Sequence, residues 1–358
     1  MIHDNLSFKS LIYGHEGTVQ CKIRSLPTQI PKNHVLVKVF AAGLNPVDAK
    51  EVIGGKLPSW LKFLSRSVVQ GCTIGFEFSG QVVDILGENN RDSIPQKDVG
   101  FQIGDKVFGT LPPFVGTLSE YVMAPVDQIY YMPSNVSYEE AASLPLVGLT
   151  ALQALRPYAP TDSSSSSSIM IIGASGGVGH VALQVASALG WKTRVAVCST
   201  SNIAYCQSLG ATHVVDYKIP GAFDDTTLPS EWDIILDCVS SADNRDRAHQ
   251  YPERFRNQCR TKYLRLGGPP LDWFYAGCER IIPYVTCFRG KEKLFWIQFP
   301  HSSSDLELLA KWCMEGKLKP TISQHIPFSP EAVQEALDTI LSRRVKGKLV
   351  VKIAEEST

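Results

Sequence analysis

The stretch IMIIGASGGVGHVALQVASALG, residues 169–190, joins one apolar segment to another through a cluster of glycines. Residues 169–172 predict a buried strand, and the apolar residues after Gly177 recur at helical spacing as far as Gly190. The glycines therefore connect a strand directly to the start of a helix, where free N–H groups and the helix dipole favour an anion. This context favours a nucleotide-binding turn, and a purely structural turn is the alternative.

The turn has the spacing of a dinucleotide site, Ala174-x-Gly176-Gly177-x-Gly179, with alanine in the first position. In such a site the middle glycine lets the backbone approach the pyrophosphate, and the last glycine lets the helix pack closely on the strand. The cofactor-binding residues predicted in this turn are Ser175, Gly176, Gly177, Val178 and Gly179.

The end of the next predicted strand indicates which dinucleotide is bound. An NAD site usually has Asp or Glu there, about twenty residues on, to accept a hydrogen bond from the ribose 2′-hydroxyl. This chain has Ser199-Thr200-Ser201-Asn202 instead. A carboxylate would repel a 2′-phosphate, whereas hydroxyl and amide groups can donate to one. The sequence favours NADP(H), although no Lys or Arg stands in this loop.

The chain divides into two regions of different pattern. The first is mostly β, with alternating strands predicted at residues 35–40, 80–86 and 105–108. From about residue 138, apolar strands alternate with helices, which implies a parallel sheet covered on both faces. The serine run 163–168 is interpreted as a solvated loop before this sheet.

Two helix starts carry sequence signals. Ser137 followed by Glu140 predicts a capping box for a helix-like segment, residues 137–158. Ser329 followed by Pro330 predicts a second helix, with a cap and proline at the first helical position.

Composition limits the classes of function. The 358 residues suggest about two domains. The 35 Lys and Arg balance the 35 Asp and Glu, so the chain has no net positive charge that would favour nucleic-acid binding. No run approaches the roughly 18 apolar residues of a membrane span. The nine cysteines include no CxxC pair, and the first residues resemble neither a secretory signal nor a transit peptide. We expect a cytoplasmic protein, with an organellar location left open.

Eight segments of the chain match, in order, the motifs of one enzyme family. They are AAGLNPVDAK (41–50), GFEFSGQVV (75–83), GDKVFG (104–109), GTLSEYVMAP (116–125), AASLPLVGLTALQAL (141–155), GASGGVG (173–179), LGATHVVDYK (209–218) and KGKLVV (346–351). On these segments the sequence resembles the medium-chain dehydrogenases/reductases of the quinone oxidoreductase (zeta-crystallin) branch. It is similar in pattern to the reticulon-interacting and ToxD-like oxidoreductases. Residues 240–262 match poorly.

The resemblance implies an α/β fold built from two domains. A GroES-like β domain, residues 1–137, would be completed by residues 300–358. The inserted Rossmann domain, residues 138–299, would bind NADP(H) on a doubly wound parallel sheet. The cleft between the domains would hold the nicotinamide and the substrate.

The metal motifs of zinc-dependent relatives are altered in this chain. Those alcohol dehydrogenases have Cys where this chain has Asn45, and GHE where it has Gly75-Phe76-Glu77. Zinc needs thiolate or imidazole ligands, which Asn and Phe cannot supply, so no metal site is expected. A quinone or an enone can accept hydride without a metal, because the charge moves to a distant oxygen that needs only a hydrogen-bond donor.

The resemblance also assigns side chains to the active cleft. Lys50, the lysine of NPxDxK, would contact the nicotinamide ribose or an enolate oxygen, and Asn45 would contact the substrate. The structural alternatives are an exposed lysine and an asparagine that bonds the backbone of its own turn.

On the cofactor side, Thr150 would lie near the nicotinamide and Val239 would face the cofactor. Ser199 and Tyr217 would contact the adenosine phosphate. A helix hydroxyl bonded to its own backbone is the alternative for Thr150, and an ordinary aromatic at a strand end is the alternative for Tyr217.

The sequence therefore predicts an NADPH-dependent, zinc-independent oxidoreductase that transfers hydride to a quinone or an α,β-unsaturated carbonyl. Its partner would be a small-molecule electron acceptor, with no nucleic acid and no membrane span. The alternative is an NADPH-binding regulatory or scaffolding protein with little turnover. The oligomeric state is left open, with a homodimer as one choice.

Overall fold

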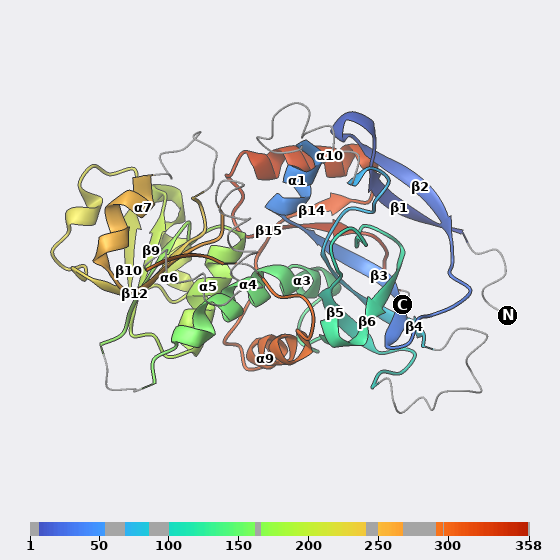
Figure 1. Cartoon of the computed structure of the whole chain (residues 1–358), viewed down its shortest axis with the longest axis horizontal. Helices are drawn as coiled ribbons and strands as arrows, with labels where there is room; N and C mark the ends of the chain where they lie inside the picture. The colour runs from blue at the N-terminus through green and yellow to red at the C-terminus, as the bar shows by residue number, and fades with distance from the viewer. Residues whose placement is uncertain are drawn as a thin grey trace. The chain divides into compact units, whose positions relative to one another are not determined.

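The computed structural model describes residues 7–53, 69–85, 100–161, 166–240, 250–267, 291–295 and 297–356 (Figure 1). The chain forms two compact units, which are described separately. Unit 1 comprises Met1–Leu149, Gln298–Gly316 and Pro320–Thr358, and unit 2 comprises Thr150–Ile297 and Lys317–Lys319. The predicted domain boundaries, 1–137 with 300–358 and 138–299, stay a prediction.

Unit 1 is built on a seven-stranded sheet in the order β14-β15-β3-β4-β5-β7, with β6 paired to β3. The strands are β3 His34–Leu44, β4 Glu77–Asp84, β5 Lys106–Thr110, β6 Tyr121–Pro125, β7 Ile129–Tyr131, β14 Ile322–Pro327 and β15 Lys348–Lys352. A separate antiparallel pair consists of β1 Ser7–Tyr13 and β2 Val19–Ser25. The late strand β15 lies inside the sheet, parallel to β14 and antiparallel to β3. An inner strand of this sheet therefore comes from a segment far along the chain from β3.

The three predicted strands of this region are confirmed as β3, β4 and β5. Their alternating pattern arises because successive side chains point to opposite faces of a sheet. Val35, Val37 and Val39 of β3 are fully buried and pack with Phe78 and Val82 of β4 in one core.

The helices of unit 1 bear out the two capping signals. They are α1 Pro46–Ile53, α3 Tyr138–Ala142, α9 Ser303–Met314 and α10 Pro330–Leu341, while α4 Pro145–Leu155 runs from unit 1 into unit 2. Ser137 and Glu140 form the predicted capping box of α3, and Ser329 caps α10. The helix-like segment 137–158 is not continuous, because α3 ends before Pro145, which starts α4. Proline lacks the N–H that a continuous helix would need there.

Unit 2 contains a six-stranded parallel sheet in the order β10-β9-β8-β11-β12-β13. Its strands are β8 Ser168–Ile172, β9 Thr193–Cys198, β10 His213–Asp216, β11 Trp232–Asp237, β12 Cys259–Arg265 and β13 Glu292–Leu294. Its helices are α5 Gly177–Ala188, α6 Ile203–Ser208 and α7 Gln250–Phe255. In chain order this is 3-2-1-4-5-6, the doubly wound order in which ligands bind at the carboxyl ends of the strands. The predicted fold class is confirmed.

The serine run differs from its prediction at one end. Ser167 and Ser168 are buried, and Ser168 begins β8. The Ser168 N–H donates to Asp233 at 2.8 Å, and the Ser167 hydroxyl accepts from the Lys192 N–H at 3.1 Å. Small hydroxyl side chains can be buried here because each finds a backbone or carboxylate partner. Residues 163–165 lie outside the described residues.

In the part of the chain that the structure describes, no helix combines the length and apolar character needed to cross a membrane.

Candidate cofactor and active site

The glycine turn of unit 2 is shaped by its first residue, Gly173. This residue has φ +78°, and a Cβ on it would lie 2.4 Å from Cγ1 of Val239. The N–H groups of Gly173 and Ala174 both donate to the Val197 carbonyl, at 3.0 and 3.1 Å, which ties the turn to β9. The sequence pattern began at Ala174 and missed Gly173, although the residue before Ala174 is itself a glycine. Only glycine combines this φ with this contact.

The later glycines differ in the space around them. A Cβ on Gly179 would lie 2.2 Å from the Gly173 carbonyl oxygen, so α5 packs against the turn with no room for a side chain. A Cβ on Gly176 would meet only that carbonyl oxygen, at 3.4 Å. Gly176 is the N-cap of α5 and its first turn is Gly177, Val178 and Gly179, whose N–H groups have no acceptor within the helix. An anion fits this open helix start.

Polar side chains from two loops meet beside this helix start. Asn202 donates from Nδ2 to the hydroxyls of Ser175, at 3.0 Å, and Ser199, at 3.2 Å. The Ser199 and Ser201 hydroxyls are 3.3 Å apart. The structure thus brings together two residues predicted from separate motifs, Ser175 and Ser199, with Asn202 as the link between them.

The end of β10 adds a tyrosine and a carboxylate. Tyr217 is 51% exposed, and its N–H donates to the Cys198 carbonyl at 3.2 Å. Asp216 accepts from the Thr200 hydroxyl and, at 3.0 Å, from the Lys218 N–H. Burial acts to raise the pKa of Asp216, but these hydrogen bonds and the Lys218 charge outweigh it and lower the pKa below its usual value. Asp216 is a charged group beside this loop that sequence reasoning missed. It is buried, and its carboxylate is held by the Thr200 and Lys218 donors.

The two remaining predicted cofactor residues lie on α4 and after β11. Thr150 is half-buried within α4. The Val239 N–H donates to Asp237 at 3.0 Å, and the fully buried Asp237 also accepts from the Tyr263 hydroxyl at 2.6 Å. This network fixes the turn that brings Val239 against Gly173.

Unit 1 contains a buried ion cluster at the position of the metal motif. Glu77 is 0% and Lys348 is 3% exposed, and their Oε1 and Nζ atoms are 2.6 Å apart. The Lys348 ammonium also donates to Oδ1 of Asn45 at 2.6 Å and to the Leu44 carbonyl at 2.9 Å. All three of its protons therefore have acceptors.

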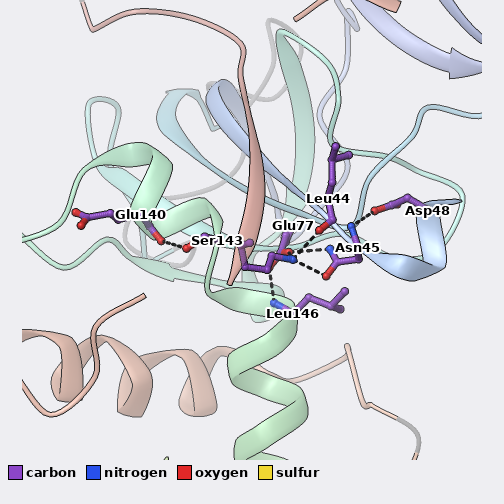
Figure 2. Close-up of polar contacts among 8 residues, drawn as sticks. Leu44, Asn45, Asp48, Glu77, Glu140, Ser143 and Leu146 are labelled. Carbon is purple, nitrogen blue, oxygen red and sulfur yellow. Dashed lines mark hydrogen bonds and ion pairs between the residues drawn. The ribbon is translucent and has the colours of Figure 1, made fainter. Parts of the chain in front are cut away.

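The Glu77 carboxylate is satisfied in the same way. Oε1 accepts from Nδ2 of Asn45 at 2.7 Å, and Oε2 accepts from the Leu146 N–H at 2.7 Å, in the first turn of α4. Figure 2 shows Asn45 and Glu77 directed toward each other, with Leu44 and Leu146 beside them. Opposite charge, complete hydrogen bonding and the positive end of a helix together compensate the burial of both ions.

Of the two predicted catalytic residues, Asn45 directly precedes α1 and Lys50 lies within it. The Asn45 side chain bonds Glu77 and Lys348, not the backbone of its own turn. The Asn45 N–H donates to the buried Asp48 carboxylate at 2.7 Å, which caps α1. Lys50 is in α1, and its side chain lies outside the described part of the structure. The catalytic roles of Asn45 and Lys50 stay predictions.

The residues at the altered metal motif do not fit a catalytic zinc. The Lys348 ammonium is 2.6 Å from both Asn45 and Glu77, so a cation already occupies the polar atoms of this motif. Phe76 offers no donor atom. Within the described ranges, no group of three or more His, Cys, Asp or Glu side chains could hold a metal ion.

Glu77 and Lys348 are buried charged residues of the candidate site that sequence reasoning did not pair. The signal for Glu77 is a lone carboxylate between Phe76 and Phe78 in a strand, and the signal for Lys348 is a lysine that begins the apolar strand KLVV. A buried charge needs a partner, so each of the two predicts that an opposite charge lies nearby, but not which residue carries it.

A β unit joined to a doubly wound unit with an open glycine turn is the arrangement that the sequence resemblance predicts for a nicotinamide-dependent oxidoreductase. Comparison with known proteins agrees. Residues 31–134 match the alcohol dehydrogenase GroES-like domain family, and residues 209–351 match the zinc-binding dehydrogenase family.

Relatives match along most of the chain. A trans-enoyl reductase of Aspergillus terreus is 32% identical over 90% of this chain and 87% of its own length. A mitochondrial NAD(P)H oxidoreductase of Homo sapiens is 30% identical over 90% of this chain and 82% of its own. The solved quinone oxidoreductase of Coxiella burnetii is 27% identical, with a TM-score of 0.74 and coverage of 98% of this chain and 100% of that one.

The chain belongs to the medium-chain dehydrogenase/reductase superfamily, in the branch of the quinone oxidoreductases and enoyl reductases. The resemblance stated from the sequence is confirmed, and so is the prediction of an oxidoreductase that uses a nicotinamide cofactor.

Proposed function

We propose that this protein is an NADPH-dependent reductase that transfers hydride to an α,β-unsaturated carbonyl or a quinone without a metal. The observation that carries the proposal is the Lys348 ammonium bonded to Glu77 and Asn45, because it leaves no Lewis acid at the altered metal motif. Conjugated acceptors suit such a site, since they delocalise the incoming charge. The names of the relatives, trans-enoyl reductase and quinone oxidoreductase, support the same acceptor class.

The glycine turn is the proposed pyrophosphate site. The N–H groups of Gly177, Val178 and Gly179 would donate to the phosphates, while Gly176 leaves the space that their approach needs. Ser199 and Tyr217 would donate to the 2′-phosphate.

NADPH, when bound, supplies the hydride. Hydride addition to the β-carbon of an enone moves an electron pair onto the carbonyl oxygen, and a proton from water then adds at the α-carbon. In the proposal the Lys50 ammonium donates a hydrogen bond to that oxygen, and Asn45 positions the substrate beside it. Asn45 directly precedes α1 and Lys50 lies within it, and Asp48 and the ion cluster fix the start of this helix.

The function is tested with purified protein, NADPH and a panel of quinones and enones, followed by absorbance at the nicotinamide band. We expect at least one acceptor to be reduced, and incubation with EDTA to leave the rate unchanged. Gly176→Asp, which places a carboxylate where the pyrophosphate would bind, is the inactive control. If NADPH raises the melting temperature but no acceptor is reduced, the regulatory alternative replaces the proposal.

The choice of cofactor gives a second test. NADPH should bind about tenfold or more tightly than NADH, because one hydrogen bond to a charged phosphate contributes roughly 1.5–3 kcal/mol. Ser199→Asp would remove a donor and add a repelling charge, so it should weaken NADPH binding and keep or strengthen NADH binding. Both affinities are measured by fluorescence titration of the reduced cofactor.

Ser166→Asp is the matched control, because Ser166 is exposed before β8, at the end of the strand opposite the glycine turn. It should change neither affinity. Equal wild-type affinity for the two cofactors, or equal weakening of both by Ser199→Asp, would show that the phosphate is not held at this loop.

A further inference from the structure

A cavity of about 590 Å³ lies within unit 1, apart from the ion cluster and the glycine turn. Its walls come from β3, β5, the start of α3, the end of β15 and the segment 354–356 that follows β15. This volume lies in the range of small-molecule sites. Among the described side chains, none that is assigned above to cofactor or substrate contributes to its lining.

An aromatic pair forms one wall. The rings of Phe40 and Tyr138 stack with centroids 4.3 Å apart, and the Lys106 ammonium lies 5.2 Å from the centre of the Tyr138 ring. The Ser79 hydroxyl donates to the Tyr138 carbonyl at 2.5 Å and fixes the residue in place. Met132 and Val136 add apolar surface to the same cavity.

The Tyr138 hydroxyl is buried and has no hydrogen-bond partner among the residues that the structure describes, and the residue is 7% exposed. Burial and, after it, the charge of Glu356 raise the pKa of Tyr138 to about 12. The hydroxyl therefore keeps its proton at neutral pH and is a donor without an acceptor. Buried donors are nearly always satisfied, so an acceptor that reaches this hydroxyl would be bound favourably.

Two carboxylates after β15 pair with the two lysines of the cavity. Glu356 lies 2.5 Å from the Lys106 ammonium, and Glu355 lies 3.1 Å from the Lys352 ammonium. The four side chains are 44–85% exposed, and exposed ion pairs are weak. With both pairs formed, three carboxylates and two ammonium groups line the cavity. A ligand that displaced Glu355 and Glu356 would meet two ammonium groups and one remaining carboxylate, Glu139, which is a net positive site.

We propose that this cavity binds a small organic anion with an apolar body, in competition with Glu355 and Glu356. The carboxylate of the ligand takes their place on Lys106 and Lys352 and accepts the hydrogen bond that Tyr138 does not make. Its apolar body lies against Phe40, Met132 and Val136. The proposal does not depend on the reductase function, because the cavity and the candidate active site share no residue.

The first experiment compares three probes of one shape on the full chain by isothermal titration calorimetry. They are 2-naphthoate, 2-naphthylmethanol and 2-naphthylmethylammonium, which are anionic, neutral and cationic. We expect one molecule of 2-naphthoate to bind per chain, with the other two at least about tenfold weaker because they form no charged hydrogen bond. Binding of the neutral or cationic probe as tightly as the anion, or no binding of the anion, overturns the proposal.

The second experiment uses variants for which the proposal predicts opposite changes in the affinity for 2-naphthoate. Lys106→Gln and Tyr138→Phe should each weaken 2-naphthoate binding about tenfold, because each removes a donor to a charged group. Glu356→Gln should strengthen it, because the competing carboxylate is gone. Lys311→Gln, an exposed lysine of α9 outside the cavity, should leave it unchanged.

Melting temperatures close to the wild type confirm that each variant is folded. A merely structural role for these residues would weaken binding in every variant. Weaker binding to Glu356→Gln, or unchanged binding to Lys106→Gln, therefore contradicts the assignment.

Discussion

Replacing Lys348 with methionine should lower the free energy of unfolding by about 3–5 kcal/mol, the range for a buried ion that loses its partner. The substitution keeps most of the side-chain volume but removes the ammonium from three acceptors, Glu77, Asn45 and the Leu44 carbonyl. Glu77 would then be a fully buried carboxylate with no opposite charge. The measurement is urea unfolding, followed by fluorescence and by circular dichroism.

The double variant Glu77→Gln/Lys348→Met separates charge from packing. Because it removes both ions, it should recover most of the lost stability, even though each single variant is strongly destabilised. Lys352→Met, in the same strand but 44% exposed and paired only with an exposed glutamate, should cost less than about 1 kcal/mol. If Lys348→Met were as mild as Lys352→Met, the cluster would not be the buried ion pair described above.

Gly179→Ala and Gly176→Ala should separate the stability of unit 2 from its affinity for NADPH. A methyl group on Gly179 would lie 2.2 Å from the Gly173 carbonyl oxygen, so α5 and the turn must move apart. We expect a loss of about 1–3 kcal/mol of stability, as for other overpacked sites. NADPH affinity should fall about tenfold or more, because the displaced N–H groups lose a hydrogen bond to phosphate.

Gly176→Ala should behave differently. Its methyl group would have ordinary contact, 3.4 Å, with the same oxygen, so the stability should stay near that of the wild type. NADPH affinity should still fall, because the methyl group would lie where the backbone approaches the pyrophosphate. Stability comes from thermal unfolding without cofactor, and affinity from titration. Equal behaviour of the two variants would show that the glycines do not have the separate roles assigned to them.

The sequence predicted best those features that depend on residues close together in the chain. The glycine turn, the capping box of Ser137 and Glu140 and the start of α10 depend on residues within a few positions of one another, and all three are present. The break before Pro145 was also local but was missed, because helical composition continues on both sides of it.

The ion cluster could not be predicted from residues that are neighbours in the sequence. Lys348 and Glu77 are 271 positions apart and meet only because β15 enters the sheet beside β3. A residue pattern predicts that a buried charge has a partner, but the partner is chosen by strand pairing over long distances. The same holds for Ser167 and Ser168, whose burial depends on Lys192 and Asp233. The roles of Lys50 and Asn45 in catalysis stay predictions.

The position of β15 has a consequence for biosynthesis. This strand lies between β14 and β3, yet the ribosome makes it after all of unit 2. Until residues 348–352 are translated, residues 41–44 of β3 have an unpaired edge and Glu77 lacks the Lys348 counterion. The nucleotide-binding unit can therefore fold while translation continues, whereas the β unit must wait for its last strand, and a nascent chain exposes an unpaired edge during that interval.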